Sequence, residues 1–199
     1  MATEINAAFV LAAGRGQRMG FPKALLRIDG ALILQRIASS YFQFGVSEVH
    51  AILSDEAAEE LKRLPEIQDS LASKGLVLHA GADARAPMME SVRCAFRVVQ
   101  TRAYQAFFLQ PIDTGPIESP ILRKLQAALV PALVAKPVYQ EHGGHPLALT
   151  REVLSRFDWK SALSLRDCLR GLEESELIRV EVNDARVLRN WNRPEDLPA

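Results

Sequence analysis

The sequence predicts a single α/β domain with a mostly parallel, mixed sheet flanked by helices. Short apolar runs alternate with longer amphipathic stretches along the whole chain, which is typical of alternating strands and helices. No repeat, charge block or low-complexity linker divides the 199 residues, so we expect residues 1–199 to form one domain. With 48% hydrophobic and 24% charged residues, the composition excludes a disordered or collagen-like protein.

Strands are expected where short runs are apolar or alternate in polarity. The run at residues 7–13 is apolar without interruption, as in a strand buried on both faces. The run at residues 178–182 alternates Ile or Val with charge, as a half-buried strand does. The full set of expected strands is 7–13, 49–53, 76–79, 106–109, 132–135, 144–149 and 178–182.

Helices are expected where apolar residues recur at three- and four-residue spacing. Gly45 stops the first of them, and Asp55 is expected to cap the second, which ends near Pro65. Ser119 and Pro120 form a typical helix start. The expected helical ranges are 32–44, 55–65, 89–100, 119–129, 151–157 and 163–172.

The charge balance and the cysteines limit the possible functions. Lys+Arg and Asp+Glu are 24 each, so the chain lacks the basic excess of a nucleic-acid binder, and self-repulsion does not oppose a homodimer. Cys94 and Cys168 are far apart and outside any C-x-x-C pair, which disfavours a zinc or redox site. Because no basic region precedes the first apolar run and no run is long enough for a membrane span, we expect a cytoplasmic protein with reduced thiols.

The segment at residues 11–23, L-A-A-G-R-G-Q-R-M-G-F-P-K, is the most informative part of the sequence. It follows a buried strand, and ligands of open α/β sheets bind beyond the carboxyl ends of strands. Glycines leave backbone N–H groups open to a ligand, and cationic side chains attract phosphate. The glycines are Gly14 and Gly16, and the cations are Arg15, Arg18 and Lys23. A solvated Gly-rich turn is the alternative, but this combination favours a polyphosphate site.

Two familiar phosphate loops do not fit this segment. A Walker A loop needs Ser or Thr after its lysine, whereas Ala24 follows Lys23. A dinucleotide loop needs G-x-G-x-x-G, but Met19 stands at the last position and Gly20 comes one residue late. These differences disfavour P-loop kinases, GTPases and nicotinamide enzymes.

The same segment resembles the signature of nucleotidyltransferases with the Rossmann-like nucleotide-diphospho-sugar transferase fold. L-A-A-G, R-M-G and P-K stand in the order typical of the molybdenum cofactor cytidylyltransferase branch, whereas the guanylyltransferase branch usually shows L-A-G-G and D-K. The resemblance extends from Phe9 to Leu197. It implies a cytidylyl donor, with residues 13–16 at the base and ribose and with Arg18 and Lys23 on the triphosphate.

Asp113 lies in F-F-L-Q-P-I-D-T-G-P-I, after an apolar strand. Mg²⁺ prefers one or two carboxylates together with phosphate oxygens, so this side chain is a candidate metal ligand; a turn residue is the alternative. The resemblance implies a metal-binding Asp here. The family pattern is commonly G-D-x-P, whereas this chain reads P-I-D-T-G-P. Pro111 stands before Ile112 and Asp113, and Gly115 moves Pro116 one position later than in the pattern.

Asn192 lies in N-W-N-R-P-E-D-L, where the family often shows D-x-D-T-P-E-D-L. The resemblance implies that this residue is the second metal ligand. With both Asn190 and Asn192 in place of Asp, the site has less negative charge and is expected to bind metal more weakly. Residues 194–196 are also expected to begin a short C-terminal helix.

The resemblance assigns further binding residues. Ser91 and Arg85, at the start of the helix expected at 89–100, are implied near the base, although helix-start chemistry alone explains such residues. His145 in G-G-H-P is implied on the acceptor side. The expected catalytic residues are Lys23, Arg18 and Asp113, the metal ligands are Asp113 and Asn192, and the nucleotide-binding set is Leu11, Ala12, Ala13, Gly14, Arg15, Gly16, Arg18, Lys23, Arg85 and Ser91.

The resemblance therefore predicts a Mg²⁺-dependent nucleotidyltransferase. It moves a nucleoside monophosphate, CMP by preference, from an NTP to a phosphorylated acceptor, with molybdopterin expected as acceptor and a client molybdoenzyme or a second copy of the chain as partner. A sugar 1-phosphate or methylerythritol phosphate is the alternative acceptor. A nucleotide-binding regulator without transfer activity and a dinucleotide-dependent oxidoreductase are the other function classes left open.

Overall fold

The computed structural model describes residues 3–14, 16, 19–73 and 75–197. Its main sheet has eight strands in the order β10-β7-β9-β6-β1-β4-β5, with β8 paired to β7. The strands are β1 (Ile5–Leu11), β4 (Glu48–Ile52), β5 (Leu76–His79), β6 (Ala106–Pro111), β7 (Val134–Tyr139), β8 (His142–Gly143), β9 (Leu147–Thr150) and β10 (Leu177–Glu181).

Most neighbouring strands are parallel, and β9 is the exception in the middle of the sheet. It runs antiparallel to β6 on one side and to β7 on the other, so β7 and β10 again run in the direction of β6 and β1. The carboxyl ends of β1, β4, β6, β7 and β10 therefore meet at one edge of the sheet. The expected mixed, mostly parallel α/β sheet is confirmed.

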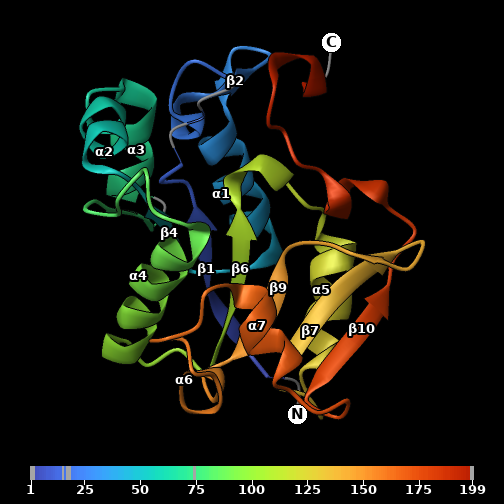
Figure 1. The fold of residues 1–199 in the computed structure, drawn as a ribbon. Helices are drawn as coiled ribbons and strands as arrows, with labels where there is room; N and C mark the ends of the chain where they lie inside the picture. Colours follow the sequence, from blue (N-terminus) through green and yellow to red (C-terminus); the bar gives the residue numbers. More distant parts are fainter. Residues whose placement is uncertain (1–2, 15, 17–18, 74, 198–199) are drawn as a thin grey trace.

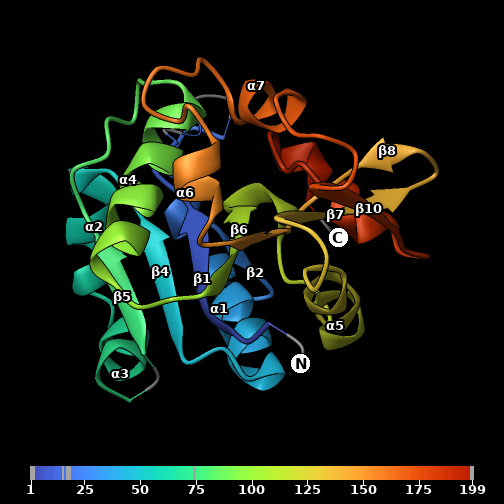
Figure 2. The same cartoon turned by 90° about the horizontal axis from the view of Figure 1, so that it is seen from below.

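Helices cover both faces of the sheet, as Figures 1 and 2 show. The elements α1 and α5 pack on one face, and α4, α6 and α7 pack on the other. The helices are α1 (Ile33–Phe44), α2 (Asp55–Lys62), α3 (Pro65–Ser73), α4 (Met88–Thr101), α5 (Ser119–Ala128), α6 (Val153–Arg156) and α7 (Leu165–Arg170). Within the described ranges, no helix is long and apolar enough to cross a membrane.

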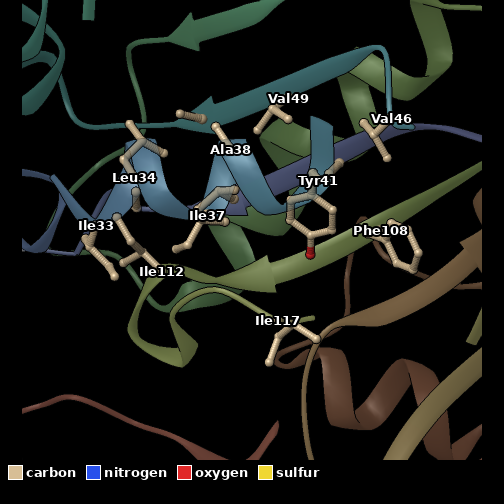
Figure 3. Packing of buried hydrophobic residues seen from close by; sticks show 14 of the residues in the cluster. Ile33, Leu34, Ile37, Ala38, Tyr41, Val46, Val49, Phe108, Ile112 and Ile117 are labelled. Atoms are coloured by element: carbon tan, nitrogen blue, oxygen red, sulfur yellow. The ribbon is translucent and has the colours of Figure 1, made fainter. Parts of the chain in front are cut away.

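Strand β1 shows why the central runs are apolar throughout. Its alternate side chains Ala8 and Val10 join the core under α1 and α5, whereas Phe9 and Leu11 join the core under α4. In the first of these cores, Tyr41 of α1 stacks on Phe108 of β6 with ring centroids 5.4 Å apart, and its hydroxyl points toward β6 (Figure 3). Burial on both faces removes the polarity alternation of an exposed strand.

Three details differ from the sequence prediction. Ser54, not Asp55, caps α2, because its side chain accepts the N–H of Ala57 at 3.3 Å. Pro65 does not end that region but starts the separate helix α3, since proline fits the first helical turn. A small hairpin of β2 (Arg27–Ile28) and β3 (Ala31–Leu32), joined by an Asp-Gly turn, was not predicted, although Asp-Gly is a strong hairpin signal.

Candidate active site

Three residues that are far apart in the sequence meet beyond the carboxyl ends of the central strands. The Nζ of Lys23 donates to Oδ2 of Asp113 at 2.8 Å and to Oδ1 of Asn192 at 2.7 Å. Lys23 and Asp113 are largely buried, with 13% and 16% of their side chains exposed. One carboxylate oxygen and one amide oxygen therefore converge on a single positively charged group.

The turn that carries Asp113 follows β6 directly. Residues Ile112–Thr114 form a 3-10 turn, which Gly115 ends with a φ of 74°. Gln110, fully buried at the end of β6, donates its side-chain amide to the carbonyl oxygen of Gly115 at 2.5 Å. The hydroxyl of Tyr41 in turn donates to Oε1 of Gln110 at 2.6 Å. A buried hydrogen-bond chain thus holds the Asp113 turn in place.

Trp191 brings the C-terminal segment to the same turn. Its indole ring is buried and lies against Gly115, where an added Cβ would stand only 2.6 Å from the ring. The carboxylate of Asp196 accepts the N–H groups of Asn192 and Arg193, both at 2.9 Å, and so closes the short turn Pro194–Asp196. The expected helix start at residues 194–196 is confirmed as a 3-10 turn.

The first loop places small residues at the same edge of the sheet. Leu11, Ala12 and Ala13 are buried, and the N–H of Ala12 is already bonded to the carbonyl of Ile52 at 2.8 Å. At Gly14, by contrast, no atom of the described residues beyond its chain neighbours lies within 4 Å of an added Cβ. The loop can therefore receive a ligand at Gly14, whereas Leu11 and Ala12 present core-facing side chains.

Gly16 gives this loop its turn. Its φ of 58° suits glycine, and an added Cβ would collide with the carbonyl oxygen of Phe21. Its own carbonyl accepts the N–H groups of Met19 and Gly20 at 2.7 and 3.0 Å. The turn leads into the 3-10 segment Lys23–Leu25, which carries Lys23 to Asp113. Arg15 and Arg18, which are also expected at this site, lie outside the described residues.

Arg85 and Ser91 lie at the start of α4. Arg85 is exposed, and its N–H donates to the carboxylate of Asp83 at 2.8 Å, whereas Ser91 is buried in the first turn of the helix. In the described part of the chain, no hydrogen bond joins either residue to Lys23, Asp113 or Asn192. Their expected role at the base stays a prediction.

A pocket of about 620 Å³ lies between the start of α4, β7, β10 and α7, and we refer to it as the β7–β10 pocket. His145 lines it, and its backbone N–H donates to the carbonyl of Val187 at 2.9 Å. The buried Nδ1 of His145 has no partner among the described residues. Burial lowers the pKa of His145 to about 4, with the carboxylate of Asp113 raising it and Lys136 lowering it. The imidazole is therefore neutral near pH 7 and lies within electrostatic reach of Asp113.

Sequence reasoning missed the cations of this pocket. Lys136 of β7, Arg166 of α7 and Arg179 of β10 all line it, but each stands in an ordinary strand or helix pattern that gives no sign of a binding site. A lysine in the otherwise apolar run V-A-K-P-V-Y was the only available signal. Only the pairing of β7 with β10 brings two of these residues together.

The other titratable groups of the described residues are structural. Cys94 and Cys168 are free, as expected, and burial raises the pKa of both thiols, which disfavours thiolate chemistry. His50 and His79 bond to each other at 2.8 Å inside a structural network. Among the described residues, no three His, Cys, Asp or Glu side chains gather as a metal cluster.

Several solved structures share this fold. A nucleotidyl transferase of Methanothermobacter thermautotroptrophicus (Mth528) is 20% identical with a TM-score of 0.71, covering 96% of this chain and 93% of that one. Rv0371C of Mycobacterium tuberculosis, solved as a complex with manganese, is 18% identical with a TM-score of 0.65, covering 96% and 94%. The inositol-1-phosphate CTP transferase of T. maritima is 14% identical with a TM-score of 0.73, covering 100% and 94%.

The family comparison goes further than the shared fold. A search of curated proteins finds no match. Residues 8–177, most of the chain, match the model of the MobA-like NTP transferase domain. That range contains the first loop, Asp113 and His145, whereas Asn192 lies beyond its end. The chain therefore belongs to the MobA-like NTP transferase domain family and is a nucleotidyltransferase of that family.

Proposed function

We propose that the protein transfers CMP from CTP to a phosphorylated acceptor, with release of pyrophosphate, and that the acceptor is molybdopterin. The single observation that carries the transfer reaction is the meeting of Lys23, Asp113 and Asn192 beside the open Gly14 loop. Residues 1–199 act in this proposal as one nucleotidyltransferase domain. Reactions of this class depend on positioning and charge neutralisation and need no protein nucleophile.

The donor set of the site fits a divalent cation. The oxygens of Asp113 and Asn192 lie within 2.8 Å of one nitrogen, so they are close enough to share a cation. A carboxylate and an amide oxygen are hard ligands, and Mg²⁺ typically takes one or two carboxylates and completes its shell with phosphates and water. We therefore assign Mg²⁺ to these two side chains. Its chemistry when bound is to offset the negative charge of the reacting phosphates.

The residues of the chain then have separate tasks. The open backbone at Gly14 and the neighbouring Arg15 receive the nucleotide, and Arg18 and Lys23 hold its triphosphate. A phosphate oxygen of the acceptor attacks the α-phosphorus of the nucleotide, a new P–O bond forms, and the bond to the β-phosphate oxygen breaks as pyrophosphate leaves. The ammonium of Lys23 stabilises the charge that develops on the phosphate oxygens, and it is free to do so once it leaves Asp113.

The choice of nucleotide and acceptor is the finer part of the proposal. The A-A-G and P-K elements of the first loop support CTP over GTP, and Arg85 and Ser91 are proposed at the base. For the acceptor, a sugar 1-phosphate or a methylerythritol phosphate is the alternative. The T. maritima neighbour, an inositol-1-phosphate CTP transferase, supports that alternative. The β7–β10 pocket beside His145 is where either acceptor is proposed to bind.

A regulator that binds nucleotide without transferring it is the second candidate. The Asn at position 192 favours it, because a site with one carboxylate attracts a metal ion less than a site with two. The two candidates differ in pyrophosphate release.

The test combines a thermal-shift screen with a pyrophosphate assay. We expect CTP with Mg²⁺ to raise Tm more than GTP, ATP or UTP, because a ligand that binds only the folded state stabilises it. Pyrophosphate should appear when molybdopterin is added. Asp113→Ala should lower turnover by about 100-fold or more while keeping the Tm of the unliganded protein. Binding without release favours the regulator, and a flat response to every nucleotide contradicts both candidates.

A further inference from the structure

We infer that the β7–β10 pocket holds a second anionic group of the acceptor through Lys136, Arg166 and Arg179, next to an apolar or flat body of the same molecule. This inference rests on the proposed function, because it assigns the substrate class of that transferase. It separates acceptors with a flat or apolar body from polyol phosphates.

Two like charges face each other on neighbouring strands of the sheet. Lys136 of β7 and Arg179 of β10 are direct partners in the parallel register, so their side chains lie on the same face. Like charges opposite each other on neighbouring strands destabilise a sheet. Burial lowers the pKa of Lys136, and Arg179 and Arg166 lower it further. A pair that is unfavourable in the free protein becomes favourable when an anion lies between the two cations.

The three cations have no neutralising partner among the described residues. Within the described ranges, Lys136, Arg166 and Arg179 make no ion pair or side-chain hydrogen bond. Arg170, a further cation of the pocket, lies 3.7 Å from Asp167. Glu141 is the one carboxylate among the lining residues of the pocket, and it is exposed on the turn between β7 and β8. The pocket thus has an excess of positive charge although the whole chain has none.

Gly143 leaves room for the side chain of Lys136. Gly143 of β8 lies against this side chain, and a Cβ at Gly143 would collide with Cε and Nζ of Lys136. The absence of a side chain at Gly143 therefore lets Lys136 lie over the β8 hairpin toward the pocket. In Figure 2, β8 projects beside β7 on the side where α7 lies.

Part of the pocket wall is apolar. Met88 and Leu163 are among the few large hydrophobic side chains with high exposure, at 54% and 85%, and both line this pocket. Met89 and Leu147 continue the apolar surface inside it. A polyol would lose water against such side chains without gaining hydrogen bonds, which is unfavourable. A flat or apolar body fits this wall, and about 620 Å³ is typical of a pocket for a small organic ligand.

Lys136, Arg166 and Arg179 are separate from Lys23, Asp113 and Asn192, which we call the transfer centre. The lining of the pocket includes His145 but not Lys23, Asp113 or Asn192, and the pKa of His145 responds to both Asp113 and Lys136. His145 is thus within electrostatic reach of both groups of residues. The attacking phosphate of the acceptor has to reach Lys23 and Asp113, so the three cations of the pocket address another anionic group of the molecule.

The experiment measures binding of two probes to the full chain by calorimetry. We expect 1-naphthyl phosphate, a flat apolar body with an anion, to bind at least about tenfold more tightly than inositol 1-phosphate. Lys136→Gln and Arg179→Gln should each weaken 1-naphthyl phosphate binding about tenfold, which corresponds to about 1.4 kcal/mol. Arg123→Gln, which removes an exposed cation of α5 outside the pocket, is the matched control and should leave binding unchanged.

A stability measurement separates a binding role from a structural one. Removal of Arg179 relieves its repulsion with Lys136. Arg179→Gln should therefore keep or raise the Tm of the unliganded protein while it weakens the binding of 1-naphthyl phosphate. The inference is wrong if both variants bind 1-naphthyl phosphate like the wild type, if the wild type does not bind it, or if inositol 1-phosphate binds as tightly. CTP binding with Mg²⁺, measured on the same samples, tests the proposed function separately. A protein that binds 1-naphthyl phosphate but not CTP would contradict the proposed function and leave the pocket inference standing.

Discussion

The backbone N–H of Trp191 donates a hydrogen bond to the carbonyl oxygen of Asp113 at 3.1 Å. This contact joins the C-terminal segment to the turn after β6. Because Asn192 is the next residue, the contact also brings its amide oxygen to the ammonium group that Asp113 contacts. The geometry of Lys23, Asp113 and Asn192 therefore depends on how Trp191 packs against the turn after β6.

Gly115→Ala should destabilise the fold and the site together. Gly115 has φ 74° and ψ −173°, a conformation that is accessible almost only to glycine, and the new Cβ would press on the ring of Trp191. We expect the free energy of unfolding to fall by about 1–3 kcal/mol and turnover to fall with it. Chemical denaturation and pyrophosphate release measure the two effects. Gly171→Ala is the control, because φ −81° with the nearest atom at 3.5 Å accepts alanine, and an equal loss there would contradict the argument.

Asn192→Asp should tighten metal binding. The change adds a carboxylate at a site that now holds one carboxylate and one amide oxygen next to Lys23. We expect the Mg²⁺ concentration that gives half-maximal activity to fall several-fold, because Mg²⁺ binds ionised oxygen more strongly than an amide. The control is Asn190→Asp, which adds the same charge at an exposed position two residues away. If both variants respond alike, Asn192 is not a ligand.

Tyr41→Phe should disturb the Asp113 turn from inside the core. The Tyr41 hydroxyl donates to Gln110, whose amide holds the Gly115 carbonyl, so the variant leaves a buried acceptor without its donor. We expect a loss of about 1–3 kcal/mol in unfolding free energy and a lower kcat with little change in KM for the nucleotide. Tyr139→Phe, at a half-buried residue whose hydroxyl has no hydrogen bond among the described residues, is the control. A change in KM without a change in kcat would argue against a positioning role.

Stability should fall as the pH drops from about 6.5 toward 4. Burial lowers the pKa of His50 to about 4, and burial also lowers the pKa of His79. His50 lies 2.8 Å from His79 and 2.8 Å from the Tyr104 hydroxyl, which donates to Glu48; Arg102 also faces the group. Because the pKa of His50 is lower in the folded protein, the unfolded chain binds the proton more readily. The contribution of neutral His50 to stability is therefore complete above pH 6.5 and is lost as the pH falls from 6.5 through about 4.

The size of this effect follows from the shift of His50 alone. The shift from 6.5 to about 4 corresponds to roughly 3–4 kcal/mol at most, since one pKa unit corresponds to about 1.4 kcal/mol. Denaturation at a series of pH values should therefore give a smaller slope between pH 4 and 6.5 for His50→Gln than for the wild type. His142→Gln, at an exposed histidine, should keep the slope of the wild type. Equal slopes in all three proteins would rule out His50 as the titrating group.

The sequence by itself determined the elements and the chemistry-bearing positions that local rules govern. The unbroken apolar run of β1 predicts a strand buried on both faces, and Gly45 predicts the end of α1, where its φ is 113°. The place of Asp113 after an apolar strand makes it a candidate oxygen ligand, the first loop makes Lys23 a phosphate cation, and the family resemblance implies Asn192 as the second ligand. The structure brings these three together, although Lys23 and Asn192 are 169 positions apart.

Only the tertiary structure decided what depends on contacts between distant segments. The antiparallel insertion of β9 cannot be read from its own residues, because a fully buried strand looks the same in either direction. The pairing of Lys136 with Arg179 and the space that Gly143 leaves for Lys136 arise from strands that meet only in the folded sheet. Local patterns report burial and turns, whereas the partner of a side chain is set by strand order and register, which no local pattern contains.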